Sequence, residues 1–362
     1  KGGAAIAVRS VADGTSVREC RLFGLAYTIG VQDDGTSTRV EYSEFTNCWV
    51  SVWIAGSGCL ITGNRFSSGP MHVGRNAVIE NNNFLGCHGN DDAASGLGGA
   101  MQVVAVTEPV TVRGNRFEAC GVDGPWEPNG QGGAIYVRGA SDLRVERNAF
   151  VGNQGKSGAA IYAENAHVTI EGNYFLANRD SLSTWENEVR GNGAGVFLTT
   201  ATGSVSSNTF HRNQAALGGA AIFLTGVCDV DVSGNLMTDN ASDVAGGVMA
   251  DSLTGSVTFA CNDAWANDGA NYLDLPDPTG VDGNISIDPE YCVPDSGTTL
   301  WSSSPCAAAH APEGCERIGA FDVGCYAPAA IDDGRLGAWR LVIVPNPARR
   351  GAHIVLADVP PE

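Results

Sequence analysis

The chain has 362 residues, with 40 acidic against 21 basic side chains, a net charge of −19 and a pI near 4.6. This charge disfavours nucleic acid and anionic membranes as partners, and no apolar stretch is long enough to span a membrane. The chain begins at Lys1, close to repeat sequence and without a signal peptide. We therefore expect a trimmed fragment of an exported protein.

One short motif recurs nine times: a β-branched or aromatic residue, two spacers, Asn, one spacer, and Phe or a substitute. Four copies are clear, and five are weaker. The clear copies span 112–117, 145–150, 170–175 and 205–210, and the weaker ones span 61–66, 79–84, 232–237, 259–264 and 281–284. Repeats at spacings of 18 to 35 residues indicate a solenoid.

Most copies continue with a second phrase, in which Asn or Cys stands three residues after the Phe position. A polar spacer of variable length and a Gly-Gly-Ala-apolar run follow, as at 98–101, 132–136 and 218–223. The apolar islands are four to six residues long and are bounded by Gly, Asn and Asp, which favours short strands over helices. We predict an all-β, single-stranded parallel β-helix of roughly ten to eleven rungs over residues 1–290.

Asn has a physical role at equal positions of stacked rungs, which lie about 4.8 Å apart. It tolerates left-handed backbone angles at a corner, and its amide donates to one rung while accepting from the other. The predicted ladder consists of Asn115, Asn148, Asn173 and Asn208. Phe two residues later should point inward and stack on its equivalents. The Gly-Gly-Ala run should fit a corner where a larger side chain would clash.

Paired Phe-x-x-Asn and Gly-Gly-Ala-Ile phrases resemble the repeats of polymorphic outer-membrane proteins and related bacterial right-handed β-helix proteins. The resemblance covers roughly residues 15–290. It implies a secreted or surface-displayed right-handed β-helix in a bacterium. It implies no particular activity, because one fold supports many functions.

Residues 291–326 predict a closing cap, which would cover the open backbone edge of the last rung. Four cysteines lie there, and their density in an exported chain favours a disulfide staple over a metal site. We expect Cys306 to pair with Cys315, closing a short loop, and Cys292 with Cys325. Residues 327–338 have the composition of a linker. Residues 339–362 resemble the start of a small C-terminal β-sandwich of the type IX sorting or hook-capping kind.

Loops that leave the coil at the variable spacer should emerge along one edge, so residues distant in sequence should gather there. Acidic, aromatic and imidazole side chains concentrate in these loops. The candidate ligand-binding residues are Trp126, Trp185, His88, Glu127 and Asp180, and the candidate catalytic carboxylates are Asp91, Asp92, Asp123 and Glu186. Aromatic surfaces beside carboxylates suit a neutral-sugar groove. Solvated loops with scattered acids are the alternative interpretation.

Three functions remain open from the sequence. The first is an exported or cell-surface protein that recognises glycan or another surface component through its loop edge, without catalysis. The second is a polysaccharide hydrolase or lyase that uses the loop carboxylates, and the third is a structural stalk or filament subunit. No metal site is indicated and no cofactor is expected, although the acidic surface leaves Ca²⁺ as a candidate ion. The oligomeric state is left open.

Overall fold

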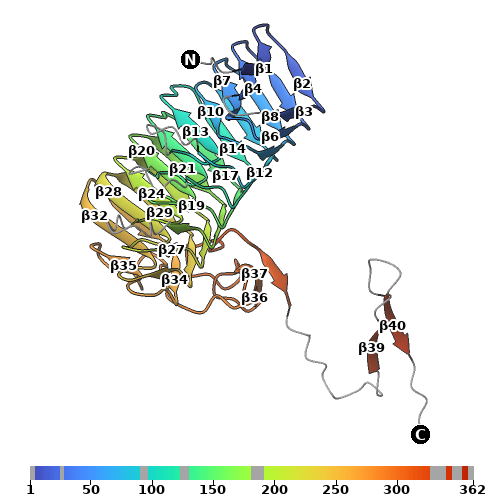
Figure 1. Ribbon diagram of the computed structural model, residues 1–362. Coiled ribbons are helices and arrows are strands. Elements are labelled where there is room, and N and C mark those ends of the chain that lie inside the picture. Colours follow the sequence, from blue (N-terminus) through green and yellow to red (C-terminus); the bar gives the residue numbers. More distant parts are fainter. Residues whose placement is uncertain are drawn as a thin grey trace. The chain divides into compact units, whose positions relative to one another are not determined.

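Three parallel sheets run along the larger part of the molecule, and each turn of the chain adds one strand to each of them (Figure 1). The computed structural model describes residues 5–24, 28–89, 97–122, 130–180, 191–326, 340–344 and 353–357. The chain divides into two units, residues 1–326 and 327–362. The larger unit contains the coil and the cap.

Sheets of eleven, ten and ten strands form the coil. The first sheet consists of β1 (Ala5–Ser10), β4 (Thr28–Asp33), β7 (Val50–Ile54), β10 (Met71–Val73), β13 (Met101–Val104), β16 (Ile135–Arg138), β20 (Ile161–Glu164), β24 (Val196–Thr199), β28 (Ile222–Val227), β32 (Val248–Thr254) and β35 (Tyr272–Leu273). The second consists of β2 (Ser16–Arg18), β5 (Arg39–Glu41), β8 (Cys59–Thr62), β11 (Ala77–Glu80), β14 (Val110–Arg113), β17 (Leu143–Glu146), β21 (His167–Glu171), β25 (Thr202–Ser206), β29 (Asp229–Ser233) and β33 (Val257–Ala260). The third consists of β3 (Arg21–Phe23), β6 (Glu44–Thr46), β9 (Arg65–Ser67), β12 (Asn83–Leu85), β15 (Arg116–Glu118), β18 (Ala149–Val151), β22 (Tyr174–Leu176), β26 (Thr209–His211), β30 (Leu236–Thr238) and β34 (Asp263–Trp265).

Three smaller sheets complete the described strands. A fourth sheet, formed in the coil directly after the third-sheet strands, contains β19 (Gln154–Gly155), β23 (Arg179–Asp180), β27 (Gln214–Ala215) and β31 (Ala241–Ser242). The cap sheet contains β36 (Tyr291–Val293), β37 (Thr298–Trp301) and β38 (Val323–Cys325). In the smaller unit, β39 (Arg340–Val344) and β40 (His353–Ala357) form an antiparallel pair. The predicted all-β solenoid of ten to eleven rungs is confirmed.

The asparagine ladder is continuous from Asn64 to Asn284. Asn148 shows the repeating pattern. Its Nδ2 donates to Asn173 Oδ1 at 3.0 Å and to the Val112 carbonyl at 2.9 Å, while its Oδ1 accepts from the amide and backbone nitrogen of Asn115. A second ladder runs from Asn153 to Asn267 in the slot after Phe. The repeat therefore satisfies its buried polar groups internally.

The left-handed backbone was expected at the ladder asparagines, and this expectation was wrong. Positive φ angles fall on the residue before each Asn, as at Gly114 (61°), Arg147 (53°) and Ser207 (54°). The residue with positive φ makes the corner, so that the side chain of the following Asn points into the coil and reaches the next rung. The position with positive φ is therefore occupied by glycine in several rungs but also admits Arg, Ser and Cys.

Phenylalanine forms the centre of the core, as predicted. Seven rings from Phe45 to Phe210 are fully buried, and neighbours stack with ring centroids 4.5–4.9 Å apart. Such contacts add to the hydrophobic free energy gained by burying each ring. The Gly-Gly-Ala corner is also crowded as expected, because a Cβ on Gly133 would lie 2.1 Å from the Gln154 carbonyl oxygen.

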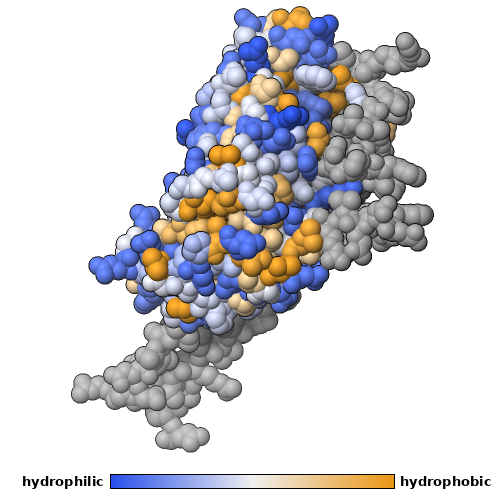
Figure 2. Space-filling view, turned by 90° about the vertical axis from the view of Figure 1, so that its left-hand side faces the viewer, coloured by the Kyte–Doolittle hydropathy of each residue, from blue (hydrophilic) through white to orange (hydrophobic). Residues whose placement is uncertain are grey.

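A second aromatic row lies on the outer side of the first sheet. Tyr136, Tyr162, Phe197 and Phe223 occupy matching positions on neighbouring strands and are buried. Glycine segments that precede the strands pack against this row, since a Cβ on Gly193 would lie 3.0 Å from the Phe223 Cβ. On the side of the coil that lies to the left in Figure 1, hydrophobic residues form separate patches between hydrophilic ones (Figure 2).

Two disulfides hold the cap. Cys292 pairs with Cys325 as predicted, with Cα atoms 5.9 Å apart, but the predicted Cys306–Cys315 pair was wrong. Cys315 instead bonds to Cys261 in the last turns of the coil, with a Cα separation of 5.6 Å. Cys306 is a buried free thiol beside Leu236, Leu300 and Ile318. Its place in this apolar cluster keeps it away from Cys315, and the bridge joins the cap to the coil instead of closing a short loop.

No helix long and apolar enough to cross a membrane occurs among the described residues.

Candidate functional site

The long loops leave the coil between the third sheet and the first. Their flanking residues stack rung on rung through the bridges His88–Gly121, Leu97–Gln131 and Ser157–Asn192. Seven predicted site residues fall outside the described residues, namely Asp91, Asp92, Asp123, Trp126, Glu127, Trp185 and Glu186. Their contribution to a ligand site stays a prediction.

Two predicted ligand-binding residues are described, and they differ in exposure. His88 is exposed next to the start of its loop. Asp180 is buried in β23, where its Oδ2 accepts a hydrogen bond from the Ala216 backbone N–H. Burial raises the pKa of Asp180 to about 6, which the N–H donors of Ala216 and Gly191 oppose. In this structure Asp180 supports the corner of the coil and is not presented at its surface.

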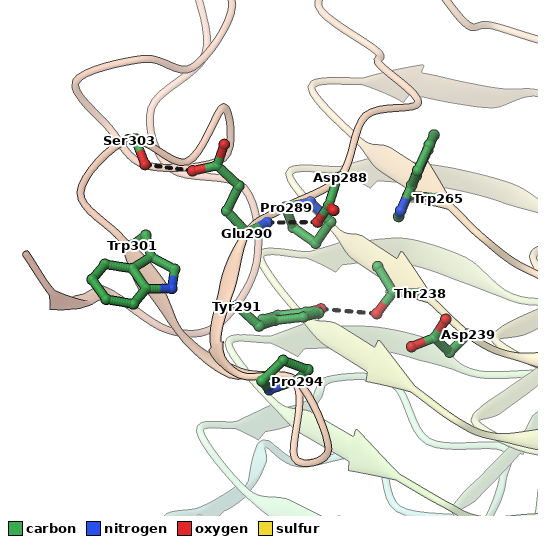
Figure 3. Close-up of a pocket in the computed structure, with 10 residues that line it drawn as sticks. All are labelled: Thr238, Asp239, Trp265, Asp288, Pro289, Glu290, Tyr291, Pro294, Trp301 and Ser303. Carbon is green, nitrogen blue, oxygen red and sulfur yellow. Dashed lines mark hydrogen bonds between the residues drawn. The ribbon is translucent and has the colours of Figure 1, made fainter. Parts of the chain in front are cut away.

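A pocket of about 600 Å³ lies elsewhere, where the cap meets the ends of the last third-sheet strands. Coil and cap residues both line it, and Figure 3 shows Trp265 and Trp301 on opposite sides of the group. The lining residues are Thr238, Asp239, Trp265, Asp288, Pro289, Glu290, Tyr291, Pro294, Trp301 and Ser303. We call this site the cap pocket.

The ends of strands place the aromatic side chains of the cap pocket. Trp265 is the last residue of β34 and is 38% exposed, although it stands in the coil. Trp301 ends β37, and Tyr291 begins β36 on the neighbouring cap strand. The Cys292–Cys325 disulfide joins β36, which carries Tyr291, to β38, whose Cys325 is paired with Trp301 of β37.

A buried hydrogen-bond network fixes the wall between the two tryptophans. The Tyr291 hydroxyl and Thr238 Oγ1 are 2.8 Å apart, and the same Oγ1 lies 2.9 Å from His211 Nδ1. Burial lowers the pKa of His211 and raises that of Tyr291, so both side chains are neutral near pH 7. Thr238 and Tyr291 therefore contribute uncharged, hydrogen-bonded hydroxyl groups to the lining.

The charged side chains that line the cap pocket are all carboxylates: Asp239, Asp288 and Glu290. Asp288 Oδ1 accepts from the Glu290 backbone N–H at 2.9 Å, and Glu290 accepts from the Ser303 hydroxyl. With no basic residue among the described residues that line it, the pocket repels anions. No group of three or more metal-binding side chains occurs in the part of the chain that the structure describes. Hydroxyl groups of a neutral ligand would find acceptors here.

A buried carboxyl group, Asp263, lies under the cap two residues before Trp265. It accepts from the Cys306 thiol at 3.1 Å and from the Ile287 backbone N–H at 3.1 Å. Burial raises the pKa of Asp263 to about 7, although both hydrogen bonds oppose this shift. The coil–cap junction thus contains an acid that titrates near neutral pH.

We expect this acid to make the cap less stable as pH rises. Because the pKa of Asp263 is higher in the folded than in the unfolded state, the folded state binds more protons between about pH 4 and 7. Stability from this group is complete below about pH 4 and is lost as pH rises through about 7. In the unmodified protein, this group should lower the free energy of unfolding by roughly 2–4 kcal/mol between pH 4 and pH 8, and Asp263→Asn should abolish this change. Urea unfolding at pH 4 to 8 measures it. The exposed Asp268→Asn is the control, and an unchanged pH profile for Asp263→Asn would refute the prediction.

Comparison with protein families agrees with this geometry. The model for the right-handed β-helix region matches residues 4–175 and 107–264. The chain therefore belongs to the right-handed β-helix family. No curated protein and no solved structure matches the chain.

Sequence reasoning missed the cap pocket because its residues come from the least repetitive part of the chain. Trp265 follows a weak repeat copy, Phe259-x-x-Asn262-x-Ala264, at a position that alternation directs outward. That outward tryptophan was a usable signal. Trp301 stands among Thr, Leu and Ser, with no motif to connect it to Trp265.

Proposed function

We propose that this right-handed β-helix protein recognises an uncharged saccharide at the cap pocket and has no catalytic activity of its own. The observation that carries the proposal is the pairing of two partly exposed tryptophans, Trp265 and Trp301, around hydroxyl and carboxylate groups. Aromatic rings pack against the apolar faces of sugars, and carboxylates accept hydrogen bonds from their hydroxyl groups. The described lining residues include no base, which argues against phosphorylated or uronic ligands.

The location that we propose is the outer surface of a bacterial cell or the medium around it. Two cap disulfides support it, since such bonds persist in oxidising compartments. We also propose that the repeats are of the polymorphic outer-membrane-protein type and that residues 339–362 begin a C-terminal sorting module. The loop edge with Trp126 and Trp185 is a further predicted contact for glycan or another surface component.

The proposal predicts a specific loss of binding. Trp265→Ala and Trp301→Ala should each weaken binding of an uncharged oligosaccharide at the cap pocket by more than about ten-fold, because each removes an aromatic contact surface. The measurement is a neutral-glycan array followed by titration calorimetry. Melting temperature, followed by circular dichroism, should change little for Trp265→Ala because the side chain is partly exposed.

Trp53→Ala is the matched control, since Trp53 is 40% exposed on the first sheet, far from the cap pocket in sequence. Unchanged affinity in both pocket variants would refute the cap pocket as the binding site. The same samples should be assayed for new reducing ends and unsaturated products. Turnover that depends on Asp239, Asp288 or Glu290 would replace recognition with catalysis as the function.

A further inference from the structure

A second hollow lies along the opposite edge of the third sheet. Strands in this sheet are parallel, so their first residues all lie along one side of the sheet and their last residues all lie along the other side. The cap pocket uses strand ends, at Thr238 and Trp265. The second hollow, of about 980 Å³, uses residues that precede or begin strands in four successive rungs, and cap residues close its other side. We call it the cap groove.

From these observations we propose that the cap groove is a second saccharide-binding site, which takes an extended, uncharged sugar chain lying along the coil axis. Four rungs span about 14 Å at the spacing of neighbouring strands, which is long enough for a short oligosaccharide. The proposal extends the saccharide recognition proposed above, but it rests on separate residues and can fail separately.

The floor and walls of the cap groove determine the ligand class. Small residues, among them Gly114, Ala149 and Gly172, lie in the lining between larger side chains. Tyr174 and Phe321 form an edge-to-face aromatic pair at 5.1 Å, with one ring from the coil and the other from the cap. This pair gives a sugar ring an apolar contact surface.

Both signs of charge line the cap groove. The lining includes the basic residues Arg116, Arg147 and Arg317 and the acids Glu146, Glu171, Glu316 and Asp322. Arg317 is ion-paired with Asp322, and Arg116 donates to Glu118, whereas Arg147 makes no ion pair among the described residues. Because the charges nearly cancel, the groove has no strong preference for an ion. Planar guanidinium and carboxylate groups can instead form hydrogen bonds with adjacent hydroxyl groups of a sugar.

A peptide is a poorer fit to the cap groove. Peptide strands bind by pairing with free backbone groups at a sheet edge. Here the backbone N–H groups of Arg147, Ala149 and Tyr174 donate to the Glu171, Asn115 and Asn148 carbonyls of neighbouring rungs. The amides of Asn115 and Asn148 are used in the ladder. A ligand in the cap groove must therefore be bound by side chains, and sugar chains are bound in this way.

The test is titration calorimetry of the full chain with uncharged hexasaccharides of β-linked glucose, mannose, galactose and xylose. The unmodified protein should bind two molecules of a recognised hexasaccharide. Arg147→Ala should weaken one binding event by about ten-fold and leave the other intact, whereas Trp265→Ala should do the reverse. Alanine already occupies the same kind of left-handed corner at Ala119 and Ala177, so Arg147→Ala should fold.

Arg144→Ala is the matched control, because Arg144 is exposed on the neighbouring strand and pairs with Asp142 outside the groove. Phe321→Ala should reproduce the effect of Arg147→Ala. The cap groove proposal is overturned if both groove variants bind as the unmodified protein does, or if a charged hexasaccharide binds more tightly than the uncharged ones. Loss in the groove variants with no effect of Trp265→Ala or Trp301→Ala would overturn the cap pocket alone. Absence of binding to every hexasaccharide would overturn both.

Discussion

Asn148→Leu should destabilise the coil by about 3 kcal/mol or more. The substitution leaves the backbone N–H of Asn115 and the Val112 carbonyl without their partner, and it breaks amide contacts to both Asn115 and Asn173. Each buried polar group left unpaired costs about 1–3 kcal/mol, and leucine compensates for none of them. Urea unfolding followed by far-UV circular dichroism measures the loss. Amide hydrogen exchange should locate it in the rungs on either side of Asn148.

Asn83→Leu is the matched control for the ladder. Asn83 directly follows the ladder residue Asn82 but points outward and is exposed. Its replacement should change stability by less than about 0.5 kcal/mol. Equal effects of the two substitutions would mean that the ladder does not carry the stability assigned to it.

Phe150→Ala should cost about 3–5 kcal/mol, because it removes a fully buried ring from the middle of the central stack. Phe150 contacts Phe117 and Phe175 on either side, each at a centroid distance of 4.9 Å. The neighbouring rungs are fixed by backbone pairing and by both asparagine ladders. They therefore cannot collapse into the cavity, and the cost should fall in the upper part of this range.

Phe23→Ala provides the comparison, since Phe23 ends β3 with 69% of its surface exposed. It should change the urea midpoint very little. Phe150→Leu should restore part of the stability by filling part of the cavity. A Phe150→Ala protein as stable as the unmodified chain would contradict the stabilising role assigned to the buried ring stack.

The sequence by itself determined the coil. In a solenoid each rung contacts its sequence neighbours, so one recurring phrase specifies the strand, the corner and the interior side chain together. The position of Asn148 two residues before Phe150 was enough to predict both the amide ladder and the ring stack. The same reasoning extends to Val40-x-x-Ser43-x-Phe45, a copy of the motif in which Ser replaces Asn. There the Ser43 backbone N–H donates to Asn64 Oδ1 and continues the ladder.

Only the tertiary structure decided how the cap packs on the coil and where the sites beside it lie. The cap does not repeat, so its position depends on contacts between segments with no common period, such as Leu300 and Ile318 against Leu236. That packing buries Cys306 and brings Cys315 to Cys261, 54 residues away, which no spacing rule anticipates. It also brings Trp301 to Trp265 and Phe321 to Tyr174. Periodic contacts can be read along a chain because each rung repeats its neighbours, whereas these pairs exist only because the cap folds back onto the third sheet.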